Sequence, residues 1–422
     1  MSRIKQITAR EILNAKGMPS VETTVLLSDG KIGVASCPSG TSVGNYEASE
    51  IKDHNENHFL GQGVLKAISN VTDIIAPNLV GIDAIKQQII DRIMIDLDGT
   101  QNKGRLGANA ILSVSMAVAK AAAKSSTLPL FLYLREYVKK EDTPLKIPTP
   151  LFNILNGGMH AGGNMDFQEF IITPASSLSY PDALNMSNSI YASLRKVLET
   201  NNLSTLTGDE GGFGPKAASN KEALTFIKEA IAAKNLRLGF DVFMGLDVAS
   251  SNFYRDKKYH IKDKSIAFSS TDLINYYDEL SKEFQLIYLE DPMAEDDWGG
   301  WTEILHKIGQ QTLIVGDDLI ATNPYRLQMA LDKKAVSGII IKPNQIGTVI
   351  ESLAVVEVAR SAGLKVIVSH RSGETNDDFI ADFAVGVSAD FVKFGAPIRG
   401  ERVAKYNRLL GINSQIKTLS NK

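Results

Sequence analysis

The second half of the chain consists of short apolar runs that each end at a charged or polar residue. Between these runs, apolar residues recur at the spacing of amphipathic helices. Strands that alternate with helices in this way favour a parallel sheet. The runs and the residues that follow them are 242–246 before Asp247, 286–289 before Glu290, 313–316 before Asp317, 338–341 before Lys342, 365–368 before Ser369, His370 and Arg371, and 390–392 before Lys393.

Six strand–helix units carry charged residues at the carboxyl ends of their strands. Barrel active sites are built at these ends, so the pattern predicts an α/β fold with a C-terminal (β/α)8-type barrel. An open, doubly wound sheet is the alternative fold. It is less favoured because no G-x-G-x-x-G pattern follows an early strand.

The first part of the chain has a different pattern. Residues 21–27 and 31–36 read as strands on either side of a turn, and residues 63–75 and 108–125 read as helices, the first ending before Pro77. Residues 139–150 are charged and rich in proline, which is typical of a linker. We therefore predict an N-terminal α+β domain over residues 1–138 and a catalytic barrel over residues 139–422.

Bulk properties narrow the class of protein. The 422 residues are 44% hydrophobic and 22% charged, which is ordinary for globular proteins. A net charge of -3 offers no positive field for nucleic acid, so none is expected as a partner. The single cysteine, Cys37, suits a reducing compartment, and neither a signal core nor a membrane-spanning stretch is visible. We expect a cytoplasmic protein.

Three strand ends carry acids that we predict to bind a metal ion. In a closed barrel, Asp247, Glu290 and Asp317 would face a common mouth and repel one another without a cation between them. All-oxygen ligation suits Mg²⁺. Asp291 and Asp318 directly follow two of these acids, and we interpret them as capping or supporting residues.

The next three strand ends carry cations. Lys342 would lie beside the metal and Lys393, and neighbouring positive charge lowers the pKa of a lysine, so that it can act as a base near neutral pH. Arg371 and Ser372 together offer a planar fork and a hydroxyl, which suit a phosphate or carboxylate. A small substrate with two or three negative charges is therefore expected.

Two glycine-rich loops add candidate acid groups. Residues 156–164 place His160 between glycines, which should leave its ring free to meet a ligand. Residues 208–215 place Glu210 in a similar setting, where it could act as a general acid with help from Glu169.

At these motifs the sequence resembles the enolases, and the resemblance spans nearly the whole chain. The N-terminal part contributes a segment similar to the mobile loop of that family and a segment similar to its first-domain signature. The matching segments are 38–44 (PSGTSVG), 94–99 (MIDLDG), 107–112 (GANAIL), 208–213 (GDEGGF), 289–292 (LEDP), 316–319 (GDDL), 342–347 (KPNQIG) and 369–375 (SHRSGET).

The resemblance implies reversible dehydration of 2-phospho-D-glycerate to phosphoenolpyruvate and water, in glycolysis and gluconeogenesis. Lys342 would abstract the C2 proton, and Glu210 would protonate the leaving C3 hydroxyl. One Mg²⁺ on Asp247, Glu290 and Asp317 would stabilise the aci-carboxylate intermediate. A second Mg²⁺ would bind together with the substrate and Ser42.

The resemblance also assigns the substrate-binding groups. Arg371 and Ser372 would hold the phosphate with His370 beside them, and Lys393 would hold the carboxylate. His160, Gln168 and Glu169 would face the hydroxyl. A homodimer or a higher homo-oligomer is expected from the family, although residues 14–19 (NAKGMP) replace the usual DSRGNP near its dimer contact. Tyr46 and Phe394 also stand where the family commonly has arginine and threonine.

Two other functions remain to be weighed. A sugar-acid dehydratase or racemase of the same superfamily would share the metal site and the α-proton abstraction, but such relatives generally lack loops 39–44 and 208–213. A catalytically silent scaffold protein would not need every acid, base and metal ligand that the chain retains.

Overall fold

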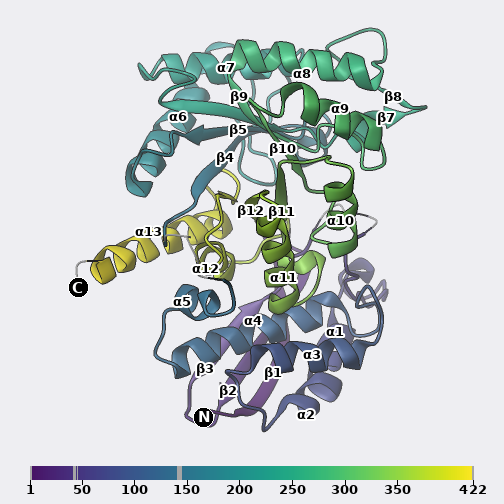
Figure 1. Cartoon of the computed structure of the whole chain (residues 1–422), viewed down its shortest axis with the longest axis vertical. Coiled ribbons are helices and arrows are strands. Elements are labelled where there is room, and N and C mark those ends of the chain that lie inside the picture. The colour runs from purple at the N-terminus through teal and green to yellow at the C-terminus, as the bar shows by residue number, and fades with distance from the viewer. Residues whose placement is uncertain (1, 41–43, 45, 140–144, 421–422) are drawn as a thin grey trace.

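The computed structural model describes residues 2–40, 44, 46–139 and 145–420, so the predicted metal ligand Ser42 lies outside the described residues. Figure 1 shows an N-terminal unit, drawn in purple and blue, below a larger unit that continues to the C-terminus. The predicted boundary after residue 138 stays a prediction, because residues 140–144 are also outside the described part.

The N-terminal unit contains an antiparallel sheet of β1 (Ile4–Leu13), β2 (Pro19–Leu27) and β3 (Ile32–Ser36), in that order. β2 alternates buried and half-buried residues, as expected for a sheet covered on one face. Helix α4 (Ala108–Ser125) packs on that sheet, and a Cβ at Gly33 would lie only 2.0 Å from the Ala117 carbonyl oxygen. Glycine at this position therefore lets the helix approach β3 closely.

The remaining N-terminal helices show that the predicted end of a helix before Pro77 is wrong. Helix α1 (Leu65–Ser69), a π-helical stretch (Asn70–Ile75) and α2 (Ala76–Leu79) follow without a break, so the chain stays helical through Pro77. Proline is tolerated there because it lies in the first turn of α2. Helices α3 (Gln87–Asp98) and α5 (Leu130–Arg135) complete this unit.

The C-terminal unit is a closed eight-stranded barrel, which confirms the predicted fold class and its six predicted strands. Going around the barrel, the order is β10, β11, β12, β13, β4, β5, β6 and β9. The strands are β4 (Thr149–Asn156), β5 (Glu169–Pro174), β6 (Val242–Asp247), β9 (Leu286–Glu290), β10 (Leu313–Gly316), β11 (Gly338–Ile341), β12 (Lys365–Ser369) and β13 (Phe391–Lys393).

The expectation of a wholly parallel sheet is wrong at one strand. β5 runs antiparallel to both β4 and β6. Sequence reasoning missed β4 and β5 because Pro148 and Pro150 read as a linker and residues 168–170 read as the end of a glycine-rich loop. Pro150 is accommodated near the start of β4, where it pairs with Val392 of β13.

A ring of helices surrounds the barrel (Figure 1). These helices are α6 (Tyr180–Thr200), α7 (Asn220–Ala232), α8 (Ser270–Phe284), α9 (Trp298–Ile308), α10 (Pro324–Asp332), α11 (Val349–Ser361), α12 (Phe379–Gly386) and α13 (Gly400–Ser420). The barrel interior has its own apolar cluster, comprising Leu151, Ile171, Tyr288, Val315, Ile340 and Ile367. This filled interior leaves the carboxyl ends of the strands as the place for a site.

The two units are joined by polar contacts at the start of α11. Asp91 of α3 accepts a hydrogen bond from the Ile350 backbone N–H (3.0 Å), and Ser115 of α4 accepts one from Val349 N–H (3.1 Å). These contacts satisfy N–H groups that a helix N-terminus leaves without internal partners. Among the described residues, no helix is long and apolar enough to span a membrane.

Candidate active site

One polar pocket gathers most of the predicted site residues. The N-terminal unit contributes Gly40 and Glu47 to its wall. The predicted residues that line it are His160, Gln168, Glu169, Glu210, Asp247, Asp317, Lys342, His370, Arg371, Ser372 and Lys393. Glu290 does not line the pocket, because it is fully buried behind Lys393. A single pocket that holds acids and cations together can bind a small anion next to a metal ion.

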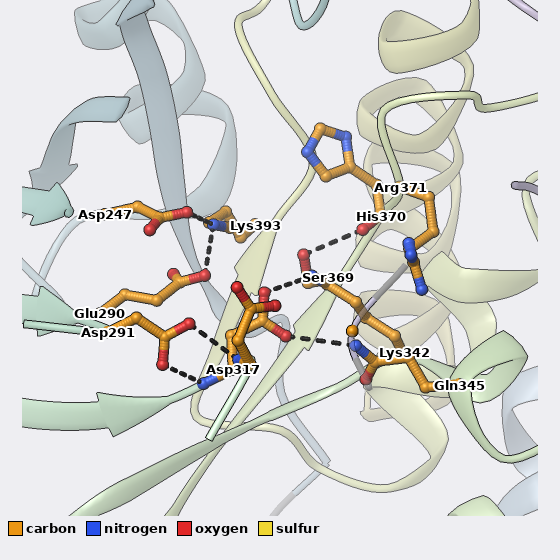
Figure 2. Close-up of polar contacts among 12 residues, drawn as sticks. Asp247, Glu290, Asp291, Asp317, Lys342, Gln345, Ser369, His370, Arg371 and Lys393 are labelled. Carbon is orange, nitrogen blue, oxygen red and sulfur yellow. Dashed lines mark hydrogen bonds and ion pairs between the residues drawn. The ribbon is translucent and has the colours of Figure 1, made fainter. Parts of the chain in front are cut away.

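Lys393 lies at the centre of an acidic cluster (Figure 2). Its Nζ lies 2.7 Å from Glu290 Oε1, 3.0 Å from Asp247 Oδ2 and 3.2 Å from Glu169 Oε2. The strand register brings these acids together, because Glu169 pairs with Asp247 and Asp247 pairs with Glu290 on adjacent strands. Although burial opposes it, these acids raise the pKa of Lys393 well above its usual range.

Lys342 pairs with Asp317 at the end of the neighbouring strands (Figure 2). Thr322 Oγ1 accepts a hydrogen bond from the Lys342 backbone N–H (2.9 Å) and donates one to Gln345 (2.7 Å). We expected a lowered pKa for Lys342, but the structure gives the opposite. Burial, Arg371 and Lys393 do lower it, yet the Asp317 carboxylate outweighs them and raises the pKa of Lys342.

The acids around the lysines fit a hard cation. Burial first, and then the nearby Asp247, raises the pKa of Glu290 well above its usual range. Burial, followed by Asp318 and Asp317, does the same for Asp291. The two lysines therefore do not supply enough positive charge for the buried acids. Carboxylate oxygens in this setting suit Mg²⁺ or a similar ion.

Among the described residues, one grouping made only of carboxylates is spaced to hold such an ion. Single oxygens of Asp291, Asp317 and Asp318 lie within 4.8 Å of one another. Asp291 also accepts hydrogen bonds from the backbone N–H groups of Asp317 (3.0 Å) and Asp318 (2.7 Å), in keeping with its expected supporting role. Among the described residues, the predicted trio of Asp247, Glu290 and Asp317 does not meet this spacing, and its members are paired with Lys393 and Lys342 instead. The trio stays a prediction.

Arg371 is held by a residue that sequence reasoning missed. Its Nη1 and Nη2 lie 2.7 and 3.2 Å from the two carboxylate oxygens of Glu47, and Nη1 also donates to Asn344 Oδ1 (3.3 Å). Burial opposes the charge, but Glu47 and Asp317 raise the pKa of Arg371 and keep it cationic. The guanidinium is therefore pre-oriented at the pocket wall beside Ser372.

The predicted acid group, Glu210, is held by hydrogen bonds from two neighbouring side chains. Glu210 Oε2 accepts hydrogen bonds from Asn153 Nδ2 and His370 Nε2, both at 3.1 Å. His160 Nδ1 lies 3.6 Å from a Glu169 oxygen and 3.9 Å from a Glu210 oxygen. The expectation that flanking glycines leave the His160 ring unburied is wrong, because its side chain is only 9% exposed, but the residue does line the pocket where a ligand could meet it.

The two glutamates have opposite pKa shifts. Burial, and then the Glu210 charge, raises the pKa of Glu169 well above its usual range. Burial would also raise that of Glu210, but His370, His160 and Arg402 together hold the pKa of Glu210 well below its usual range. Burial lowers the pKa of His370 to about 4. These opposite directions favour a proton on Glu169 over a proton on Glu210.

Arg402 of α13 also contacts the site loops and was missed, as were Glu47 and Asn153. Nothing in the residues around them singles them out, because their partners lie far away in the sequence.

Comparison with known families gives a match for each of the two units. Residues 4–134 match the family model described as the enolase N-terminal domain. Residues 144–421 match the model described as the enolase C-terminal TIM barrel domain. Together these matches cover almost the entire chain. The chain therefore belongs to the enolase family.

Proposed function

We propose that this protein catalyses the reversible dehydration of 2-phospho-D-glycerate to phosphoenolpyruvate and water. The observation that carries the proposal is that one pocket is lined by both a half-buried lysine, Lys342, and a buried carboxylate, Glu210. A β-hydroxy acid that loses water needs both groups, one to remove the α-proton and one to protonate the leaving hydroxyl.

In this proposal, the neutral amine of Lys342 takes the proton from C2. Its pairing with Asp317 holds the amine at the pocket wall and, in the free protein, keeps it protonated. An ion bound to Asp317 would compete with Lys342 for that carboxylate. The base would then have the lower pKa that proton abstraction requires.

Glu169 and Glu210 supply the proton for the C3 hydroxyl. The opposite pKa shifts of these residues favour Glu169 as the one of the two that holds a proton. His160 lies within 3.9 Å of both carboxylates and can pass or share that proton. Gln168 lines the same wall and can hold the hydroxyl.

The cations of the pocket bind the two acid groups of the substrate. We assign the phosphate to Arg371 and Ser372, which line the pocket, since a guanidinium fork and a hydroxyl match its oxygens. We assign the substrate carboxylate to Lys393, and in this proposal His370 supports the acid side through its hydrogen bond to Glu210.

We assign Asp247, Glu290 and Asp317 as the holders of one Mg²⁺, with Ser42 and the substrate helping to hold a second. When bound, Mg²⁺ supplies positive charge next to the carboxylate on which negative charge develops. Expected but untested features are a cytoplasmic location and a homodimeric or larger assembly.

A direct test is an ultraviolet assay for the conjugated enol of the product. Folded protein supplied with Mg²⁺ and 2-phosphoglycerate should give a rising absorbance that depends on the metal. Absence of any signal would contradict the proposal, and turnover of a sugar acid instead would favour the rival member of the superfamily.

A further inference from the structure

We propose that Arg402 is a positioning residue that ties the loop carrying Glu210 to the loop carrying Arg371 and fixes His370 as a hydrogen-bond donor to Glu210. The functional part of this inference rests on the proposed dehydration. Its structural part, the state of the His370 ring, can be tested without any substrate.

The Arg402 guanidinium binds four acceptors. Nη1 lies 2.8 Å from His370 Nδ1 and 2.5 Å from the Arg371 carbonyl oxygen. Nη2 lies 2.7 Å from the Ser372 carbonyl oxygen and 3.3 Å from that of Asp209. Each of these two nitrogens carries two hydrogens, so each of the four hydrogens has its own acceptor. The residues that accept them belong to two loops more than 150 positions apart in the sequence.

This contact decides which nitrogen of His370 carries the proton. An arginine in a protein can only donate, so Nδ1 of His370 must accept and cannot hold a hydrogen. The proton of the neutral ring therefore lies on Nε2, which is 3.1 Å from Glu210 Oε2. The result is a chain of donors that runs from Arg402 through His370 to Glu210.

Packing holds these three groups against one another. A Cβ at Gly395 would lie 2.8 Å from the Glu210 carbonyl oxygen, 2.9 Å from His370 Cε1 and 3.2 Å from Arg402 Cδ. The Ala396 backbone N–H also donates to the Glu210 carbonyl oxygen (2.9 Å). No side chain larger than a hydrogen fits between them, so a shift of Arg402 is passed to His370 and Glu210.

Charge pairing is only a small part of what surrounds this buried cation. The Arg402 side chain is fully buried, and the carboxylate nearest to its Nε, that of Glu401, is 3.5 Å away without a hydrogen bond. Lys405, one turn later and equally buried, is 2.9 Å from the Glu374 carboxylate and donates to the Thr375 carbonyl oxygen (3.0 Å). Lys405 binds residues 374 and 375, and Arg402 is the one of these two cations that contacts His370.

The matched pair defines the test. In Arg402→Lys the charge remains, but one ammonium cannot bridge both loops. We expect C2-proton exchange of 2-phosphoglycerate to persist, while dehydration falls by about 10- to 100-fold relative to exchange. In Lys405→Met any loss should affect both rates together, so their ratio should stay at the wild-type value. Equal ratios in the two variants would overturn the positioning role.

A second measurement needs no activity. Nitrogen NMR of ring-labelled histidine, with the His370 signals assigned through His370→Gln, should show wild-type His370 as a neutral ring protonated on Nε2. Arg402→Lys should shift or broaden that signal, and Lys405→Met should not. A wild-type ring protonated on Nδ1 would refute the inference even if the enzyme dehydrates 2-phosphoglycerate. If the wild type makes no product, the proposed function fails. The His370 ring signal still tests whether Arg402 sets which ring nitrogen carries the proton.

Discussion

Replacing Lys393 with methionine tests how the site balances its charge. The substitution removes the common cation of Glu169, Asp247 and Glu290 and keeps a side chain of similar length. At 2.7 Å, the shortest of the three separations, Coulomb's law with an effective dielectric constant of about 20 gives an attraction of about 6 kcal/mol. Desolvation offsets part of it, and breaking a buried pair costs about 3–5 kcal/mol. We expect that loss in the free energy of unfolding at neutral pH.

The loss should be recoverable by a divalent cation. Without the Lys393 ammonium, the cation in direct contact with these three carboxylates is gone, so Mg²⁺ should bind the variant at least tenfold more tightly than the wild type. A tenfold gain corresponds to about 1.4 kcal/mol of additional stabilisation. Denaturant unfolding with chelator and with saturating Mg²⁺ measures both quantities. Lys405→Met is the control, because that lysine pairs with one carboxylate outside the pocket. Equal stabilisation by Mg²⁺ in wild type and Lys393→Met would refute the reasoning.

Three further predictions concern single groups. Lys342→Ala should abolish exchange of the C2 proton, whereas Glu210→Gln should keep exchange and block dehydration; equal loss of exchange in both would contradict the assigned roles. Arg371→Lys should raise the KM for 2-phosphoglycerate by about 10- to 100-fold, because one charge-assisted hydrogen bond is worth about 1.5–3 kcal/mol, and an unchanged KM would exclude Arg371 from phosphate binding. Burial raises the pKa of Asp91 from 3.8 to about 7, with Glu351 adding to the effect. The fold favours its neutral form, so the contribution of Asp91 to the free energy of unfolding should be greatest below about pH 4 and fall by about 4 kcal/mol as the pH rises to about 7. Unfolding curves across this window should be flatter for Asp91→Asn, and parallel curves for the two proteins would argue against a raised pKa.

The regular part of the fold could be predicted from the sequence because the local hydrophobic pattern agrees with the position of each strand in the barrel. Each of the six predicted barrel strands is a short apolar run buried on both faces, and its end coincides with a charged residue such as Asp247 or Lys342. β5 could not be predicted in this way. Its antiparallel direction depends on pairing with β4 and β6, and no local residue encodes that pairing.

The candidate site shows the same division. Residues that follow a strand or lie between glycines could be named from the sequence, and the structure brings most of them to one pocket. Glu47 and Arg402 could not, because each is defined by a partner 324 or 32 positions away, respectively. The direction of the Lys342 pKa shift was also out of reach, since it depends on the contact with Asp317.

Proton NMR of 2-phosphoglycerate in heavy water, with the folded protein and Mg²⁺, tests the central claim most directly. The account predicts that the C2 proton signal disappears and that the two vinyl protons of phosphoenolpyruvate appear, both only when metal is present. A substrate spectrum that stays unchanged with folded, Mg²⁺-loaded protein would contradict it.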